Sequence, residues 1–342
     1  MTSAAEDLAN ALAPEIRPAM LGWFERVKRD LPWRQTSDAY AIWISEIMCQ
    51  QTQVATVIPY WERWMAAFPD AQTLAATELD DVLSYWAGLG YYRRARMIHA
   101  AAKQIVDVGL PSDFEGWKAL PGVGRYTAGA VASIAFDEHV AVVDGNVERV
   151  LSRLFMIGAL ASNSQREKQL WKCAQAIVDP ERPGDFNQAI MELGALVCTP
   201  RSPKCDECPI QAQCQAFAAG SVASFPPPKK KTRVKSQVTH LVGLRHEGSY
   251  AFVQRPLDGL HGGLWEFPSA DDSAFEAFRA RHAQPIWQVG EFEHLFSHIR
   301  MTYRVHLSEA ATRSDDYRWV DQPSELALSA AMQKALRIVE AE

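Results

Sequence analysis

The sequence predicts two domains, an all-α domain followed by an α+β domain. The 342 residues are enough for about two separate cores. Apolar residues recur with helical spacing over most of residues 4–178. Residues 221–236 are rich in Pro and Lys and lack this periodicity, and short alternating runs typical of strands follow them. We therefore expect a helical domain over residues 1–220, a linker over 221–236 and an α+β domain over 237–342.

The first helix is predicted from Ala4 to Lys28, and the proline of the Leu31–Arg34 turn prevents it from continuing. Residues 40–60 have the pattern of one long helix, and its first half is apolar nearly all round, as in a buried helix. The glycines of the Gly88–Tyr92 segment interrupt the shorter helical patterns after it. The further predicted helices are Phe114–Ala119, Arg125–Phe136, Val147–Phe155 and Gln165–Val178.

Glu46 is the only ionisable residue in the apolar first half of the long helix. Burial disfavours the charged form of a carboxyl group, so we expect its pKa to be raised and the group to hold a proton near neutral pH. Such a group can act as an acid. The alternative is a buried glutamate paired with an arginine or with the backbone.

Gly122 and Gly124 interrupt the two flanking helical patterns within the Leu120–Gly124 segment. Glycines allow the backbone amides of such a turn to point outward, and a helix N-terminus that follows adds a favourable dipole for an anion. A phosphate site is therefore possible. Two glycines in this spacing also occur in ordinary tight turns.

Asp144 lies between the apolar run Val140–Val143 and the amphipathic segment Val147–Phe155, which is an N-cap position. Amide hydrogen bonds and the helix dipole are expected to keep its carboxylate ionised. Asp144 can be a structural cap alone. Together with a protonated Glu46, however, it provides the acid and the anion that acid-assisted cleavage of a glycosidic bond requires.

In the second domain, strands are predicted over 238–244, 250–254, 286–292 and 298–307, and helices over 271–282 and 324–341.

The net charge of −6 argues mildly against a nucleic-acid partner, but binding depends on one face of the molecule. Residues 226–240 carry five basic residues and no acid, and residues 91–96 combine tyrosines with arginines. Solvated charge runs are the alternative. No apolar run is long enough to span a membrane, and the N-terminus lacks the pattern of a secretory signal. We expect a protein of the bacterial cytoplasm, associated with the nucleoid.

Four of the six cysteines fall in one segment with the spacing C-x6-C-x2-C-x5-C. Without a secretory signal, thiolate ligands of a metal are favoured over disulfides, and the residues alone leave zinc and an iron–sulfur cluster open. The proposed ligands are Cys198, Cys205, Cys208 and Cys214.

The motifs quoted so far resemble those of one enzyme superfamily. The sequence LPGVGRYTA at residues 120–128 resembles the helix-hairpin-helix of DNA base-excision glycosylases, and VDGNVERV at 143–150 resembles the segment with their catalytic aspartate. The cysteine spacing is that of the 4Fe-4S loop of endonuclease III-like members. The resemblance covers residues 21–214 and narrows to the MutY-type adenine DNA glycosylase family. This narrowing rests on Leu31–Arg34, Ser45–Glu46 with Gln50–Gln53, Gly88–Tyr92 and Tyr126.

This resemblance implies a fold and a set of roles. The fold is an all-α helix-hairpin-helix glycosylase domain with a 4Fe-4S loop, followed by an α+β Nudix-like domain. Glu46 would protonate adenine and Asp144 would stabilise the sugar cation, while Tyr126 and Asn146 would support Asp144 and the attacking water. The residues expected to bind DNA or adenine are Trp33, Arg34, Gln50, Gln51, Tyr91, Gly122, Gly124 and Gln188.

The second domain resembles the Nudix-like domain that reads 8-oxoguanine in the MutY-type family. Residues 262–268 match the segment before a Nudix box, but the glutamates of the box are absent, so pyrophosphate hydrolysis is not expected. Phe296, Ser297 and His298 match the loop for the oxidised guanine. The expected substrate is double-stranded DNA with an A:8-oxoguanine or A:G mispair, bound by a monomer. Some family members carry Lys where this chain has Glu148, so no amine role is transferred there.

Three other functions compete with this interpretation. The first is an endonuclease III-like glycosylase with AP-lyase activity and another specificity. Lyase-type relatives have a nucleophilic lysine at the position of Tyr126, and a phenol cannot form the Schiff base. The second is a Nudix hydrolase, which the missing glutamates disfavour. The third is a noncatalytic lesion-binding protein, which would leave the paired Glu46 and Asp144 without a purpose.

Overall fold

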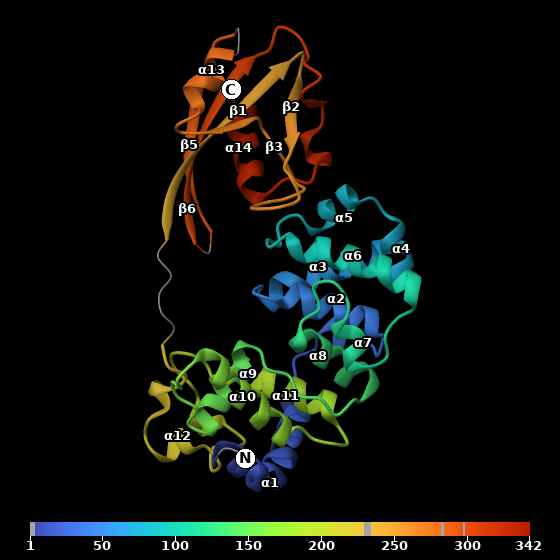
Figure 1. Ribbon diagram of the computed structural model, residues 1–342, viewed down its shortest axis with the longest axis vertical. Coiled ribbons are helices and arrows are strands. Elements are labelled where there is room, and N and C mark those ends of the chain that lie inside the picture. Colours follow the sequence, from blue (N-terminus) through green and yellow to red (C-terminus); the bar gives the residue numbers. More distant parts are fainter. Residues whose placement is uncertain (1–3, 229–233, 282–283, 297) are drawn as a thin grey trace. The chain divides into compact units, whose positions relative to one another are not determined.

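The computed structural model describes residues 4–228, 234–281, 284–296 and 298–342. The chain divides into two compact units: Met1–Thr73 with Ala100–Lys229, and Leu74–His99 with Lys230–Glu342. The first is helical and the second contains a sheet (Figure 1). Within the described residues, no helix is both long and apolar enough to cross a membrane. The predicted domain boundaries stay a prediction.

The helices of the first unit follow the predicted order, with one correction. Residues 40–60 do not form one helix, because α2 ends at Cys49 and α3 begins at Val54. Gln51 between them has a φ of 56°, in the left-handed region that ends a helix. The elements of this unit are α1 (Ala4–Val27), a 3₁₀ turn (Pro32–Arg34), α2 (Ala39–Cys49), α3 (Val54–Ala67), α7 (Phe114–Lys118), α8 (Arg125–Phe136), α9 (Gly145–Leu154), α10 (Asn163–Ile177), α11 (Pro183–Leu196) and α12 (Gln215–Ala218). The helix α4 (Ala71–Ala76) spans the boundary between the units.

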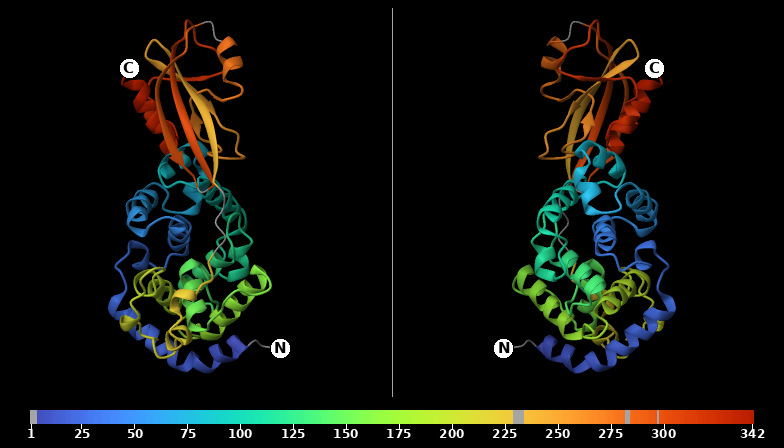
Figure 2. Two further views of the ribbon diagram at one scale, coloured as in Figure 1. Left: turned by 90° about the vertical axis from the view of Figure 1, so that its left-hand side faces the viewer. Right: turned by 90° about the vertical axis from the view of Figure 1, so that its right-hand side faces the viewer.

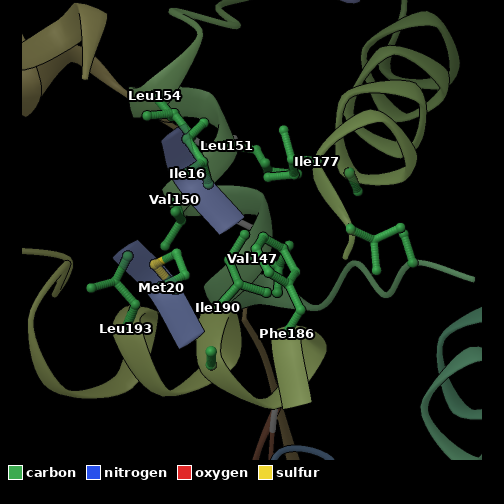
Figure 3. Packing of buried hydrophobic residues seen from close by; sticks show 14 of the residues in the cluster. Ile16, Met20, Val147, Val150, Leu151, Leu154, Ile177, Phe186, Ile190 and Leu193 are labelled. Carbon is green, nitrogen blue, oxygen red and sulfur yellow. The ribbon is translucent and has the colours of Figure 1, made fainter. Parts of the chain in front are cut away.

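Apolar faces of α1, α9, α10 and α11 form the core of the first unit. Val147, Val150 and Leu151 of α9 belong to one buried cluster with Ile190 and Leu193 of α11 (Figure 3). Both helices also carry residues of the predicted site, Asn146 on α9 and Gln188 on α11. The same packing that removes these apolar side chains from water therefore fixes the positions of the polar groups beside them.

A mixed sheet forms the centre of the second unit. Its main strand order is β3-β2-β1-β6-β5, with β4 paired to β1 and β7 paired to β2, and β1 runs parallel to β6. The strands are β1 (Lys235–His246), β2 (Ser249–Gln254), β3 (Trp265–Glu266), β4 (Ser269–Asp271), β5 (Trp287–Leu295), β6 (Ile299–Glu309) and β7 (Arg318–Val320). The helices are α5 (Leu79–Trp86), α13 (Phe275–Arg281), α14 (Ala330–Glu340) and the first part of α6 (Arg93–Val108).

The sheet has a helix on each face (Figure 2). Leu241 of β1 belongs to the core cluster with α14, whereas its neighbour Val242 belongs to the cluster with α13. This alternation is the two-residue period of a strand that is buried on both faces. Gly243 lets α14 approach closely, since a Cβ there would lie 2.9 Å from a methyl group of Val339.

Two helix predictions in the second unit begin too early. The helix predicted from Asp271 starts at Phe275, because Ser269–Asp271 pairs with β1 as β4. The helix predicted from Ser324 starts at Ala330, after a 3₁₀ turn at Pro323–Glu325. The short strands β3, β4 and β7 were not predicted.

Candidate active site

Glu46 lies on α2, where nine of the eleven residues are buried. The pKa of its carboxyl group is raised to about 7, because burial and the nearby charge of Asp144 raise it more than the Tyr126 hydrogen bond and Arg34 lower it. The predicted rise in this pKa is confirmed. Glu46 as a whole residue is partly exposed.

Tyr126, in the first turn of α8, donates its phenol hydrogen to Oε2 of Glu46 at 2.5 Å. The phenol oxygen also lies 3.2 Å from Sδ of Met191. Burial is the largest cause that raises the pKa of Tyr126 well above its ordinary value. The phenol thus contacts the acid directly, and the expected support of Asp144 by Tyr126 stays a prediction. Periodicity could not reveal this contact between residues 80 positions apart.

Asp144 is the N-cap of α9, as predicted, and accepts hydrogen bonds from the backbone amides of Asn146 and Val147 at 2.9 and 2.7 Å. The side-chain amide of Asn146 donates to Oδ2 at 3.0 Å. These donors lower the pKa of Asp144, yet burial is the larger effect and raises it above its ordinary value. The cap geometry alone did not reveal this effect of burial, and the expected ionised state of Asp144 stays a prediction. The three donors still fix both carboxylate oxygens in place.

A buried glutamate that the sequence analysis did not single out organises the next group. Glu192 on α11 is 1% exposed and pairs with Arg29 at 2.7 Å and Arg34 at 3.0 Å. The two guanidinium groups outweigh burial and lower the pKa of Glu192 to about 2. Arg34 also donates to the side chain of Gln188 at 3.1 Å. Arg34 thus links Gln188 to Glu192 and lowers the pKa of Glu46.

The other predicted site residues of the first unit lie on the turns beside these helices. Trp33 is buried, with its ring edge-on to Trp61. Gln50 donates to the hydroxyl of Thr127 on α8 at 3.1 Å, whereas Gln51 is exposed.

The predicted hairpin lies between α7 and α8 and its two glycines are exposed. Gly122 has a φ of 75°, which L side chains rarely adopt, and Gly124 is the N-cap of α8. The N-terminal amides of α8 are therefore at the surface, where an anion can reach them.

Three predicted residues belong to the second unit and are described there by themselves. Tyr91 is 49% exposed and has a φ of 47° in the turn before α6. Phe296 is partly buried and His298 is exposed at the turn between β5 and β6. Ser297 lies outside the described residues.

The four predicted ligands Cys198, Cys205, Cys208 and Cys214 line one small pocket, and Arg153 lies at its wall. Four thiolates that line one pocket fit a 4Fe-4S cluster, which takes one thiolate on each iron, and they also fit a single zinc ion.

Two arginines of α9 bind the cysteine segment. Arg153 is 3% exposed and donates to Sγ of Cys198 at 3.2 Å and to the carbonyl of Thr199 at 2.8 Å. Arg149 donates to the carbonyl of Cys198 at 2.7 Å and to the side-chain oxygen of Asn146 at 2.9 Å. Because Asn146 in turn donates to Asp144, hydrogen bonds connect the cysteine segment to the catalytic candidate.

This arrangement matches known families along the chain. Residues 44–176 match the model of HhH-GPD superfamily base excision DNA repair proteins, residues 198–214 the iron-sulfur binding domain of endonuclease III, and residues 239–337 the NUDIX domain. An adenine DNA glycosylase of Homo sapiens is 39% identical over 98% of this chain and 76% of its own length.

The chain belongs to the adenine DNA glycosylase family. A solved structure of a thermostable thymine-DNA glycosylase covers 64% of this chain and 100% of its own, with a TM-score of 0.55 and 27% identity. A non-covalent endonuclease III-DNA complex covers 61% of this chain and 97% of its own, with a TM-score of 0.50 and 25% identity. The predicted fold, a helix-hairpin-helix glycosylase domain followed by an α+β Nudix-like domain, is confirmed, as is the 4Fe-4S cofactor.

For this member of the adenine DNA glycosylase family, sequence reasoning missed Glu192, Arg149 and Arg153. Glu192 could have been found by the argument used for Glu46, because it is an acidic residue in an otherwise apolar stretch of α11. It also lies one helical turn after Gln188, on the same face. Arg149 lies in the middle of α9 and Arg153 in its last turn, and nothing in their spacing indicates the cysteine segment as their partner.

Proposed function

We propose that this chain hydrolyses the N-glycosidic bond of adenine in double-stranded DNA where adenine is mispaired with 8-oxoguanine or guanine. The reaction would begin base excision repair. The observation that carries the proposal is the hydrogen bond from Tyr126 to Glu46, a carboxyl group whose pKa is about 7 and which lies near Asp144. Two carboxyl groups with different surroundings are what acid-assisted glycosidic cleavage needs.

Glu46 is the proposed general acid. Adenine leaves poorly as an anion, so a proton must reach the base as the bond to the sugar breaks. A group with a pKa of about 7 is protonated in about half of the molecules at neutral pH and still transfers its proton readily. Such an acid contributes a factor of about 10² to 10⁴ in rate. Glu46 would donate to the base directly or through water.

Asp144 is the proposed stabiliser of the positive charge that develops on the sugar. The two backbone amides and Asn146 hold its carboxylate before the reaction starts, so no reorganisation is needed in the transition state. Removing such an electrostatic partner costs about 3 to 4 kcal/mol. This contribution is comparable with that of the acid, whose rate factor corresponds to about 2.7 to 5.4 kcal/mol.

A monofunctional enzyme follows from the chemistry of Tyr126. The phenol donates a hydrogen bond to the acid and cannot form a Schiff base with the sugar. Water would then be the nucleophile, and the product would be an abasic site in an intact strand. The expected product distinguishes this proposal from that of a glycosylase with lyase activity.

The remaining predicted residues supply binding. The exposed hairpin at Gly122 and Gly124 and the N-terminal amides of α8 would bind a DNA phosphate. Extruding adenine from the stack costs a few kcal/mol, and an exposed Tyr91 would fill the gap. The Nudix-like domain would read the oxidised guanine with Phe296 and His298. The protein would act as a monomer in a bacterial cytoplasm.

The test is single-turnover cleavage of duplexes that carry adenine opposite 8-oxoguanine, guanine or thymine, developed with and without alkali. We expect strand breaks only after alkali, fastest opposite 8-oxoguanine. Breaks without alkali would mean a lyase, and equal rates opposite all three bases would remove the proposed reading of the lesion. Glu46→Gln is the matched inactive control, since it keeps the shape of the side chain.

A further inference from the structure

We propose that Asp80 is a positioning residue that fixes the Tyr91 turn to the loop expected to read the lesion. Asp80 lies in the first turn of α5, and the Tyr91 turn (Gly88–Tyr92) joins α5 to α6. Phe296 directly follows the β5 strand of the same compact unit. This inference rests on the proposed function, because it assigns the origin of lesion preference.

The Asp80 carboxylate receives side chains from three strands. Oδ1 accepts a hydrogen bond from the Gln254 amide of β2 at 2.7 Å. Oδ2 accepts one from the indole of Trp265 in β3 at 3.1 Å and lies 3.8 Å from Nη1 of Arg318 in β7. Arg318 also lies over the ring of Trp265, 4.8 Å from its centroid. A surface carboxylate with one flexible partner contributes little to stability. Several donors that bind both oxygens of one carboxylate, as here, hold the donor side chains in fixed positions.

The contact continues along the loop between β2 and β3. Arg96 of α6 donates to the carbonyl of Gly262. Gly263 has a φ of 82°, and a Cβ at that position would lie 3.2 Å from Leu83 of α5. This loop therefore packs closely against α5 and α6, and a larger residue at Gly263 would be strained and crowded.

A series of aromatic rings then connects the Tyr91 turn to Phe296, at the start of the loop expected to read the lesion. The ring of Tyr92, next to Tyr91, lies edge-on to His261 with 6.1 Å between centroids. His261 lies edge-on to Phe296 at 5.3 Å, and Phe296 contacts His294 at 4.6 Å. Edge-on aromatic pairs at these separations favour one orientation of the two rings. Tyr92, the neighbour of the exposed Tyr91, is thus connected to Phe296 through one packed series of rings.

Asp80 would therefore influence the specificity for the lesion without contacting DNA. When Asp80 holds the series together, the presence of 8-oxoguanine at the Phe296 loop and the insertion of Tyr91 into the stack favour each other. Loss of Asp80 would release this coupling and leave Glu46 and Asp144 unaltered. The rate opposite 8-oxoguanine would fall towards the rate opposite guanine.

The test compares Asp80→Ala with Asp81→Ala in the full-length protein with its cluster. Asp81 is an exposed neighbour in the same first turn, and among the described residues its carboxylate has no hydrogen-bonded partner. Both substitutions remove one negative charge near the same helix N-terminus, so the helix-dipole effect is matched. We expect Asp80→Ala to lower the ratio of single-turnover rates, A:8-oxoguanine over A:G, about tenfold, the size of one charge-assisted hydrogen bond. Asp81→Ala should leave the ratio unchanged.

Hydrogen–deuterium exchange of the DNA-free protein tests the positioning itself. Asp80→Ala should speed exchange in the β2–β3 loop around Gly262 and Gly263, whereas Asp81→Ala should not. Gln254→Ala changes the exposed hydrogen-bond partner of Asp80 and should reproduce both effects. This variant serves as the test if Asp80→Ala does not fold. Identical exchange and identical rate ratios in the Asp80 and Asp81 variants would overturn the inference. A wild type that does not prefer 8-oxoguanine would overturn the proposed lesion reading instead, and the exchange result would still decide whether Asp80 positions the loop.

Discussion

Tyr126→Phe provides the sharpest test of the proposed acid. The substitution removes the phenol hydrogen that is donated to Glu46 at 2.5 Å and little else. That hydrogen bond lowers the pKa of Glu46, whereas burial raises it. Together with the charges of Asp144 and Arg34, these effects give a pKa of about 7. A hydrogen bond to a charged group contributes about 1.5 to 3 kcal/mol, and one pKa unit corresponds to about 1.4 kcal/mol. The variant should therefore have a Glu46 pKa about one to two units higher.

The sign of the pH effect follows from the role of Glu46 as a proton donor. The rate is constant while the carboxyl group is protonated and falls about tenfold per pH unit above its pKa. The wild-type rate should begin to fall above a pH of about 7. The fall should begin about one to two pH units later in Tyr126→Phe. Single-turnover adenine release at saturating enzyme, measured from acidic to alkaline pH, gives this profile directly.

Tyr40→Phe is the matched control, since it removes another buried phenol of the first unit. The Tyr40 hydroxyl donates to the carbonyl of Phe68, and Tyr40 does not influence the pKa of Glu46. Its profile should coincide with that of the wild type, even if its stability falls. A Tyr126→Phe profile with an unmoved or more acidic alkaline limb would refute the assignment of Glu46 as the titrating acid.

Three further substitutions test the carboxyl groups and their support. Glu46→Gln removes an ionisation that burial disfavours. Its free energy of unfolding, measured in urea, should therefore exceed that of the wild type by an amount that grows above pH 4.5 and levels off near pH 7 at about 3 kcal/mol. A difference that does not depend on pH would contradict this expectation. Asp144→Asn removes the charge of the carboxylate, so single-turnover rates should fall about 10²- to 10³-fold. Asparagine is also a good N-cap, so DNA affinity and Tm should change little. A rate near that of the wild type would exclude the electrostatic role of Asp144. Gly194→Ala places a Cβ atom 2.6 Å from the Cβ atom of Asn146, so this variant should have a lower Tm than the wild type. The control Gly145→Ala adds a Cβ atom that meets no atom within 4 Å, so its Tm should not fall. Equal Tm values for the two variants would show that α11 can move away from α9 freely.

Local chemistry made part of the site predictable. The buried pattern of α2 was enough to predict the rise in the pKa of Glu46, because desolvation acts on any carboxyl group in that setting. The N-cap position of Asp144 followed from the boundary between an apolar run and an amphipathic one. Its pKa did not follow, since the packing of distant segments around the cap determines how much of the carboxylate is buried.

Partners far apart in the sequence were beyond the reach of periodicity. The Tyr126–Glu46 bond and the Glu192 pairs join residues separated by 80 and by about 160 positions. The break between α2 and α3 was missed because helical spacing continues on either side of it. The extended backbone of Gln50 and the left-handed backbone of Gln51 end the helix. The strands β3, β4 and β7 have two or three residues each, too few for an alternating pattern.

The two proposed catalytic groups depend on different parts of the fold, and this difference sets how each can fail. Glu46 depends on an apolar helix and one phenol, so substitutions near it should alter proton affinity. Asp144 depends on a cap whose Asn146 is bonded to Arg149, and Arg149 is bonded to the Cys198 carbonyl. A change in the cysteine segment therefore reaches Asp144 through hydrogen bonds and alters its position. It reaches the pKa of Glu46 only through the charge of Asp144, a smaller cause than burial and the Tyr126 hydrogen bond. Damage to the cysteine segment should accordingly lower the plateau of the pH–rate profile more than it shifts the alkaline limb.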